Sequence, residues 1–331
     1  MKALVYTAPL EMSFLDQPEP SAKENESIIE VEAVGICGSD MHAYQGHDAR
    51  RVPPLVLGHE VCGRIIEGPD VGSRVILNPL ITCGYCHYCQ TGRFNICSNR
   101  TMIGMNRPGG YAERVAIPNQ CLVSIPDEMN PVLAALTEPA ATGLHSLVLA
   151  DRALMRPVDE CRALVIGAGS VGLLTALLLA HRGCRQIEIA ERNPLRRQPA
   201  EQENIGRVYD PIDEVTDNDV FDLVIDCVGG EKTRQLAMAA IAPGGVFVHV
   251  GLMDNNNGFD ARKITLAEIT VIGAYTYTTA DLASAAEKLH HGAYGELQWI
   301  QTRPLSAGSA AFAELLQGEI AAPKVVLLPG S

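Results

Sequence analysis

The ten residues Ala163–Gly172, ALVIGAGSVG, decide the fold of the middle of this 331-residue sequence. Four apolar residues lead, as in a buried strand, and an apolar stretch with the composition of a helix follows, up to Arg182. Glycines at such a turn let a pyrophosphate approach the helix N-terminus, where the helix dipole favours an anion. The stretch therefore predicts a dinucleotide-binding turn, with phosphate contacts from Gly167, Gly169, Ser170, Val171 and Gly172.

An acidic residue ends the next predicted strand, as this interpretation requires. Glu191 follows the strand Gln186–Ala190, 24 residues beyond Gly167, and can accept hydrogen bonds from both hydroxyls of an adenosine ribose. A 2′-phosphate would meet a like charge there, so we expect NAD, with NADP less favoured. Arg192 could stack on adenine or bind a 2′-phosphate. Further cofactor contacts are expected at the ends of two later strands, from Val228 and Val250.

The segments around this stretch indicate an α/β fold with two kinds of region. From 163 to about 274, strand-like and helix-like segments alternate, which predicts a doubly wound parallel sheet of Rossmann type. The earlier part is rich in β-type residues and in turns, and the last part returns to mixed structure. We expect a nucleotide-binding domain at 139–274, inserted into a β-rich domain formed by 1–138 and 275–331.

Individual elements follow from the same patterns. Strands are expected at 27–34, 60–67, 72–77, 109–117, 163–167, 221–228, 245–250 and 324–328, and helices at 131–150, 169–182, 231–242 and 280–290. Pro194 and Pro199 are expected to disrupt the helix after the second strand of the parallel sheet. The polar segment Asp254–Gly258 is expected to be a flexible loop, bordering either the cofactor or only solvent.

The composition excludes several classes of protein. Apolar residues make up 47% and charged residues 20%, so the chain is globular rather than disordered. The longest apolar run, Val171–Ala180, is too short to span a membrane. Twenty-six basic and thirty-nine acidic residues give a net charge of −13, which argues against nucleic-acid binding. The N-terminus is not a signal peptide, so we expect a cytoplasmic protein whose ten cysteines stay reduced.

Four of these cysteines lie close together in the segment 80–100, which we expect to form a metal-binding lobe. The run CGYCHYCQTGRFNIC contains Cys83, Cys86, Cys89 and Cys97. Four thiolates leave no open position on a tetrahedral zinc ion, so such a site is structural. Iron–sulfur ligation is the rival metal interpretation. His87 could compete as a ligand but is expected to face solvent.

A second group of potential ligands is dispersed along the chain. CGSDMH begins at Cys37 and contains Ser39 and His42, GHE contains His59 and Glu60, and TEP contains Glu138. Taken singly, each residue is more typical of core packing or an exposed carboxylate than of a metal site. Their combination suggests a second metal site.

Together these motifs resemble the zinc-containing medium-chain alcohol and polyol dehydrogenases, of the sorbitol dehydrogenase-like kind, over essentially the whole chain. GGYAERV at 109–115, DCVG at 226–229 and PGG at 243–245 belong to the same resemblance. It implies a GroES-like catalytic domain with two zinc ions per chain. Cys37 and His59 would bind the catalytic zinc, with Glu60 or Glu138 as the third ligand, and the four-cysteine group would bind the structural zinc.

The resemblance also implies an activity, which is hydride transfer between a secondary alcohol and NAD. Ser39 would take the hydroxyl proton and pass it through the cofactor ribose toward His42, while Glu60 would act beside the zinc. Glu138, where alcohol dehydrogenases often carry cysteine, favours polyols, sugar alcohols, cyclitols or sugar acids as the small-molecule substrate. A homodimer or homotetramer is expected.

The substrate pocket is poorly specified by the sequence. Its candidate residues are Tyr44, His47, Leu55, Met102, Tyr275 and Tyr277. Two other functions remain open: a ketone or aldehyde reductase that uses NADP, and a nucleotide-binding protein without catalysis. A nucleotide-binding protein without catalysis would be expected to lack the catalytic ligands, but the sequence retains them.

Overall fold

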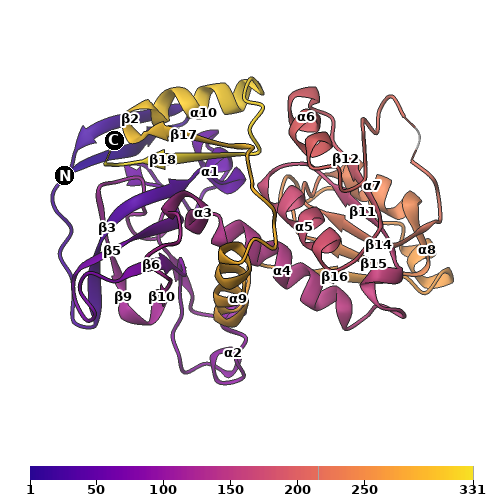
Figure 1. The fold of residues 1–331 in the computed structure, drawn as a ribbon, viewed down its shortest axis with the longest axis horizontal. Helices are drawn as coiled ribbons and strands as arrows, with labels where there is room; N and C mark the ends of the chain where they lie inside the picture. The colour runs from indigo at the N-terminus through magenta and orange to yellow at the C-terminus, as the bar shows by residue number, and fades with distance from the viewer. Residues whose placement is uncertain (215, 331) are drawn as a thin grey trace.

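The glycine-rich stretch lies in a six-stranded parallel sheet of the computed structural model, which describes residues 1–214 and 216–330 (Figure 1). Its strands, in spatial order, are β13 (Arg207–Tyr209), β12 (Gln186–Ala190), β11 (Arg162–Ile166), β14 (Phe221–Asp226), β15 (Ile241–His249) and β16 (Thr270–Gly273). The chain runs from β11 to β12 and β13 on one side, then returns to β14 on the other. Ligands of such sheets bind at this reversal, outside the carboxyl ends of the strands.

Helices cover both faces of this sheet because its strands are apolar on both sides. Val165 packs in one core cluster with residues of α5 (Ser170–His181) and α4 (Thr137–Asp151). Leu164 packs in another, with residues of α7 (Glu231–Ala240). A strand buried on both faces is typical of parallel sheets between helix layers. The predicted doubly wound domain is confirmed.

Each glycine of the turn occupies a different structural environment. Gly167 has φ +96°, a region that favours glycine. A Cβ on Gly172 would lie 1.9 Å from the Gly167 carbonyl oxygen, so this position permits no side chain. A Cβ on Gly169 would meet no described heavy atom within 4 Å. The turn is therefore tight on its inner side and open where α5 begins.

Both ends of the chain build the β-rich lobe (Figure 1). Its main sheet contains, in spatial order, β10 (Leu122–Ser124), β6 (Arg74–Leu77), β5 (Glu60–Glu67), β3 (Glu26–Gly35), β18 (Lys324–Leu328) and β17 (Ile300–Pro304), and β9 (Arg114–Pro118) also pairs with β3. The smaller sheets are β2 (Glu11–Asp16), β1 (Lys2–Ala8) and β4 (Leu55–Val56), and β7 (Leu80–Ile81) with β8 (Thr101–Met102). Because β18 pairs with β3, the α/β lobe is an insertion into the β-rich lobe, as predicted.

The remaining helices join or flank the lobes. In the β-rich part and its extensions lie α1 (Gly38–Tyr44), α2 (His87–Gln90), α3 (Pro131–Ala135) and α10 (Gly308–Gln317), and in the α/β part lie α6 (Pro194–Gln202) and α8 (Ala261–Leu266). Helix α9 (Thr279–His290) lies beside α4 (Figure 1), and the His145 and Asp281 side chains join the two at 2.8 Å. Within residues 1–214 and 216–330, no helix combines the length and the apolar character needed to cross a membrane.

Two local predictions were wrong. Helix α6 forms in spite of its prolines. Pro194 lies in the first turn, where backbone N–H groups have no helical partner, and Asn193 caps that turn by accepting from the Leu195 N–H at 2.9 Å. Pro199 is buried within α6, so packing outweighs its lost hydrogen bond. The strand expected at 109–117 begins only at Arg114.

The segment Asp254–Gly258 forms a loop, as predicted, and a buried side chain binds it. Arg234 of α7, 2% exposed, donates to the Asp254 carboxylate at 2.5 Å and to the carbonyls of Asn256 and Asn257 at 2.9 and 2.8 Å. No residue within the segment indicates this partner, because Arg234 lies 23 residues before Asn257.

Candidate functional site

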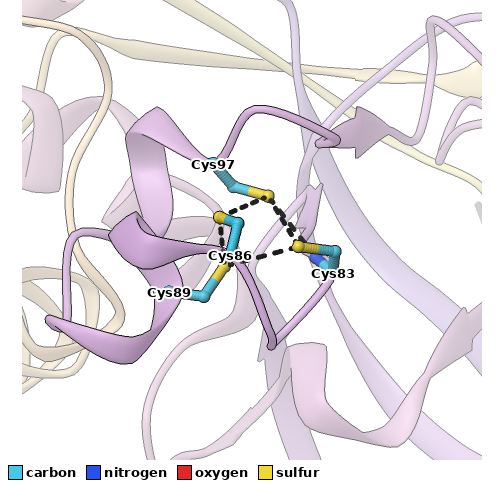
Figure 2. Close-up of side chains that lie close together, drawn as sticks. All are labelled: Cys83, Cys86, Cys89 and Cys97. Atoms are coloured by element: carbon cyan, nitrogen blue, oxygen red, sulfur yellow. Dashed lines mark hydrogen bonds between the residues drawn. The ribbon is translucent and has the colours of Figure 1, made fainter.

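The four clustered cysteines converge in the lobe around α2 (Figure 2). The Cys83 sulfur lies 4.0 Å from that of Cys89 and 3.5 Å from that of Cys97, and the Cys86 sulfur lies 3.6 and 3.9 Å from the same two. A zinc ion with bonds of about 2.3 Å separates tetrahedral thiolates by about 3.8 Å. The thiols are free, so this group could hold one zinc-sized ion.

The backbone favours the thiolate form of one of these four cysteines, Cys86. N–H groups of Cys89 and Ser98 point at the Cys86 sulfur and lower the pKa of its thiol to about 6. Thiolate is the form that ligates a metal. His87 is exposed and lies outside the four-sulfur group, as expected from the sequence.

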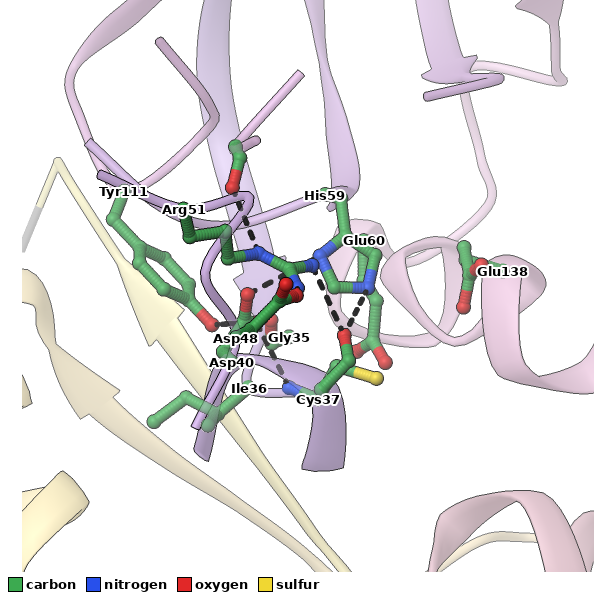
Figure 3. A network of polar contacts seen from close by, with 12 residues as sticks. Gly35, Ile36, Cys37, Asp40, Asp48, Arg51, His59, Glu60, Tyr111 and Glu138 are labelled. Atoms are coloured by element: carbon green, nitrogen blue, oxygen red, sulfur yellow. Dashed lines mark hydrogen bonds and ion pairs between the residues drawn. The ribbon is translucent and has the colours of Figure 1, made fainter. Parts of the chain in front are cut away.

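A second group forms where β3 and β5 pair. Gly35, at the end of β3, is in register with Glu60, at the start of β5. This pairing brings Cys37, the N-cap of α1, next to His59. Ligand atoms of Cys37, His59 and Glu60 all lie within 4.8 Å of one another (Figure 3). Sulfur, nitrogen and carboxylate oxygen are the zinc ligands found in catalytic sites, so the group fits that ion.

His59 is held by a buried acid behind it. Its Nδ1 lies 3.3 Å from Asp40 Oδ1, and both side chains are almost fully buried. Tyr111 donates its hydroxyl to Asp40 at 2.6 Å, and the Cys37 N–H donates at 3.2 Å (Figure 3). A carboxylate on one ring nitrogen orients the other toward a metal, which leaves Nε2 of His59 as the ligand atom.

Charge pairing dominates the protonation of these two groups. Burial acts to raise the pKa of Asp40, but the charges of His59 and Arg51 and the Tyr111 hydroxyl hold it well below its usual range. Burial acts to lower the pKa of His59, and the Asp40 and Cys37 side chains outweigh it and raise that pKa. The pair is thus a charged unit in the metal-free protein.

Glu60 is bound to a buried lysine from the far end of the chain. Lys324 Nζ donates to both carboxylate oxygens at 2.6 Å and to the Ile36 carbonyl at 2.9 Å. Glu60 is 0% and Lys324 1% exposed. A buried lysine normally loses its proton, but the Glu60 charge raises the pKa of Lys324. Glu60 therefore lies between the other two residues of the ligand group and the charged ammonium group of Lys324.

Glu138, the other candidate ligand, stands apart from this group at the start of α4 (Figure 3). Tyr277, which is buried, donates its hydroxyl to the Glu138 carboxylate at 3.0 Å. Burial raises the pKa of Glu138 to about 7, and the charge of Glu60 adds to the effect. The metal-free geometry thus groups Glu60, not Glu138, with Cys37 and His59.

Glu138→Gln is expected to change how the stability of the metal-free protein depends on pH. The folded-state pKa, about 7, lies above the ordinary value of 4.5. The stability that this group contributes is complete below pH 4.5 and is lost as the pH rises through 7. Metal-free wild type should therefore lose about 3 kcal/mol relative to the neutral glutamine variant between pH 5 and 8, measured by urea unfolding. Parallel pH profiles of the two proteins would contradict this expectation.

Ser39 and His42 lie on α1, beside the ligand group. Ser39 Oγ is 3.5 Å from His59 Nε2 and accepts from Arg51 Nη2 at 3.3 Å. His42 is half-buried, and burial, together with the nearby His47 and Arg51, lowers its pKa, so the ring is neutral near pH 7. A hydroxyl beside the ligands and a neutral imidazole farther along the helix are suitable for proton transfer.

The expected nucleotide-binding residues lie at the carboxyl edge of the parallel sheet. Glu191 accepts from the Ala168 N–H and the Asn193 N–H, both at 2.8 Å, so its carboxylate is fixed beside the glycine-rich turn. Helix α5 has Gly169 as its N-cap residue and no side-chain cap among the described residues, which leaves N–H groups for a phosphate. A surface groove of about 450 Å³ is lined by Glu191, Arg192, Asn193, Asp210, Ile212 and Asp213. A dinucleotide fits this arrangement.

Val228 and Val250 lie at the same edge. Val228 contacts the turn, since a Cβ on Gly167 would lie 2.6 Å from its Cγ2. Val250 follows β15 and donates its N–H to the Asp226 carbonyl at 2.9 Å.

The expected pocket residues have different surroundings. Tyr44 is buried, with its ring 5.3 Å from that of Phe312, which favours ordinary packing, the other interpretation of this residue. Tyr275 stacks under the Arg100 guanidinium at 4.7 Å. Met102 is buried, Leu55 is half-buried and His47 is exposed.

Sequence reasoning missed the supporting residues Lys324, Arg51 and Asp40. Lys324 gave a weak signal, since a lone cation begins an otherwise apolar strand, which suggests a buried partner. Asp40 lies inside the CGSDMH motif, but nothing in the pattern showed that it faces His59. Arg51 gave no signal in the sequence.

Comparison with known proteins identifies the family. The description "Alcohol dehydrogenase GroES-like domain" matches residues 23–127 and "Zinc-binding dehydrogenase" matches residues 170–291. L-galactonate-5-dehydrogenase of Escherichia coli (strain K12) is 30% identical over 306 residues, 88% of this chain and 88% of that protein. L-threonine 3-dehydrogenase of Salmonella paratyphi B (strain ATCC BAA-1250 / SPB7) is 30% identical over 278 residues, 78% of this chain and 80% of that protein.

A solved structure agrees with these matches. The zinc-binding dehydrogenase from Sinorhizobium meliloti 1021, bound to NADP, is 28% identical, with a TM-score of 0.86 and coverage of 99% of both chains. The structural likeness covers 99% of the chain, and it includes both segments that match the family descriptions. The chain therefore belongs to the zinc-binding, GroES-like alcohol dehydrogenases, and it is an oxidoreductase of that medium-chain family.

Proposed function

We propose that this enzyme oxidises a secondary alcohol of a polyol or sugar acid with NAD, at a zinc ion held by Cys37, His59 and a carboxylate. The observation that supports it most is the group of Cys37, His59 and Glu60, with ligand atoms within 4.8 Å of one another. Glu60 is the third ligand in this proposal, and Glu138 is the alternative. Ser39, beside His59, supplies the hydroxyl that proton transfer needs.

The chemistry divides between bound groups and side chains. A zinc ion bound there would lower the pKa of a substrate hydroxyl, and an oxidised nicotinamide would accept the hydride. Ser39 Oγ takes the hydroxyl proton and releases its own proton toward the solvent side. His42 receives a proton there because its lowered pKa keeps the imidazole neutral. Asp40 keeps the His59 ring in the orientation for ligation.

The four-cysteine group is proposed to bind the second zinc, which makes two zinc ions per chain. Sulfur spacings of 3.5 to 4.0 Å support a single ion. They are short for a polynuclear iron–sulfur cluster, whose iron and sulfide atoms lie between the thiolates. The structural role follows because four thiolates fill a tetrahedral ion.

A carboxylate-bearing substrate is the narrower proposal within this class. The two relatives are, by name, dehydrogenases of L-galactonate and L-threonine, and both compounds carry a carboxylate and a secondary hydroxyl. In this chain His47 is exposed on the segment that follows α1, whereas Arg50 beside it already binds the Asp48 carboxylate at 2.8 and 2.9 Å. Reduction of a ketone with NADP remains the alternative reaction of the same site.

Glu191→Ala is expected to weaken NAD binding about tenfold and NADP binding much less. The carboxylate is fixed by two N–H groups at 2.8 Å, so it presents its free lone pairs to a ribose. Loss of a hydrogen bond to a charged group costs about 1.5 kcal/mol, whereas NADP would also lose a repulsive neighbour. Fluorescence titration with both reduced cofactors measures the effect. Equal weakening of both would argue against the ribose contact.

We also propose a cytoplasmic homo-oligomer, a dimer or tetramer. Strand β16 is the last in the described order of the parallel sheet, and Val271 on it is 37% exposed. The nearby Leu266 is 72% exposed. An unpaired strand edge with apolar neighbours is suited to pairing with a second copy. Sedimentation measurements of the purified protein determine the number of subunits.

The proposed reaction is tested by nicotinamide reduction with a substrate panel. Zinc-replete protein is given polyols, cyclitols, sugar acids, L-threonine and simple secondary alcohols, with NAD and NADP in parallel. We expect turnover with NAD and a sugar acid or polyol. Turnover only with NADP and ketones would favour the reductase alternative. If no substrate of the panel is turned over and the protein holds one zinc ion per chain, the result would favour a nucleotide-binding protein without catalysis.

A further inference from the structure

One buried cation lies beside the proposed site and outside its group of ligand residues. Arg51 is 3% exposed and belongs to the segment between α1 and β4. Its Nε donates to the Gly104 carbonyl at 3.1 Å, its Nη1 to Asp48 at 2.5 Å, and its Nη2 to Ser39 Oγ at 3.3 Å. Figure 3 shows the guanidinium among the residues that surround His59. The arginine thus binds three separate parts of the β-rich lobe.

The contact with Ser39 restricts what that hydroxyl can do. A serine hydroxyl has one proton to donate and two lone pairs to accept with, and a guanidinium can only donate. Arg51 therefore occupies one lone pair of Ser39 and can never receive its proton. The other described neighbour of Ser39 Oγ is His59 Nε2, at 3.5 Å, the nitrogen that Asp40 leaves for a metal. One lone pair then remains for a substrate hydroxyl.

We infer that Arg51 is a positioning residue that sets the direction of proton transfer through Ser39. The inference rests on the proposed function. The substrate O–H bond breaks and an Oγ–H bond forms, while the original Ser39 proton leaves to a base on the solvent side. With an oxidised nicotinamide bound, the electron pair of the substrate C–H bond would leave as hydride to it, while the electron pair left on the substrate oxygen would form the second bond of the C=O group. Ser39 ends the step neutral, and Arg51 stays charged throughout.

The side chain of arginine suits this role better than lysine would. The planar fork can reach Gly104, Asp48 and Ser39 at once, and it keeps its charge in a buried place. Asp48 neutralises it, since Arg50 and Arg51 both bind this carboxylate and hold the pKa of Asp48 at about 2, against the burial that would raise it. The positive charge of Arg51 also disfavours an additional proton on Ser39 Oγ, so it favours release of the original hydroxyl proton as the substrate proton arrives.

The test is a double-mutant cycle between Arg51→Met and Ser39→Ala. Turnover of the best panel substrate is measured at saturating NAD, in H₂O and D₂O. We expect Ser39→Ala to lower kcat about a hundredfold and Arg51→Met about tenfold, with a larger solvent isotope effect in Arg51→Met. In the Ser39→Ala background, Arg51→Met should change kcat less than twofold. Zinc content and NADH affinity should match wild type in each variant.

Two further variants separate positioning from stability. Arg107→Met removes another partly buried arginine of the same lobe, which binds Glu26 at 2.8 Å, and should leave kcat unchanged. Arg51→Lys keeps the charge without the fork, so kcat should fall at least threefold in the wild-type background and not in Ser39→Ala. If Arg51→Met does not fold, Arg51→Lys replaces it in the double-mutant cycle.

The outcomes distinguish this inference from the proposed function. Unchanged kcat in Ser39→Ala would remove the proton-transfer role of Ser39 and, with it, the role of Arg51. A loss in Ser39→Ala with an equal, additive loss from Arg51→Met or Arg51→Lys in both backgrounds would overturn the inference alone. An equal loss of kcat in Arg107→Met would also overturn it, because the effect would then be one of stability.

Discussion

Cys37→Ser is expected to lower kcat/KM for the best alcohol about a thousandfold and to reduce the zinc content from two ions per chain to one. A serine hydroxyl stays protonated at neutral pH and is a poor zinc ligand, whereas Cys37 offers a sulfur atom within 4.8 Å of the His59 and Glu60 ligand atoms. A Lewis acid contributes several kcal/mol to such a reaction, and each 1.36 kcal/mol is tenfold in rate. Initial rates and metal analysis measure both effects.

Cys97→Ser provides the opposite control. Its sulfur lies 3.5 Å from that of Cys83 in the other group, so this variant should also retain one zinc but lose thermal stability. Cys37→Ser should keep a melting temperature near that of wild type. If Cys37→Ser kept full turnover and two zinc ions, the proposed catalytic site would be wrong. If Cys97→Ser kept two zinc ions and the wild-type melting temperature, the structural site would be wrong.

Much of the fold could be predicted because its signals are local. The strand expected at 60–67 is β5, and the helix expected at 280–290 is α9 with one further residue at its start. Apolar runs, turn residues and caps lie within these segments themselves. The helix α6 was missed because its prolines are a local signal against a helix. The packing that buries Pro199 comes from residues outside the segment, so the segment itself does not show it.

The candidate site divides in the same way. The four clustered cysteines span fifteen residues, so their spacing alone predicts a metal group. Cys37 and His59 are brought together by one antiparallel pair of strands, which the β-rich pattern made plausible. The contact between Lys324 and Glu60 spans 264 residues, and no pattern along the chain could pair them.

Lys324→Met is expected to destabilise the metal-free protein by about 3–5 kcal/mol, the usual cost of leaving one charge of a buried ion pair unpaired. Glu60 is fully buried and accepts from Lys324 with both oxygens at 2.6 Å. Without the ammonium group, the carboxylate has to take up a proton or remain charged in an apolar place. Urea unfolding of protein treated with a chelator measures the loss.

The matched control is Glu60→Gln in the Lys324→Met background. It removes the unpaired charge, so most of the lost stability should return, which a simple packing defect at Lys324 would not allow. Zinc should act in the same direction, because a cation at Cys37 and His59 also compensates the Glu60 charge. The loss caused by Lys324→Met should thus be smaller in the zinc-loaded protein. An equal loss with and without zinc would argue that Glu60 does not face the metal.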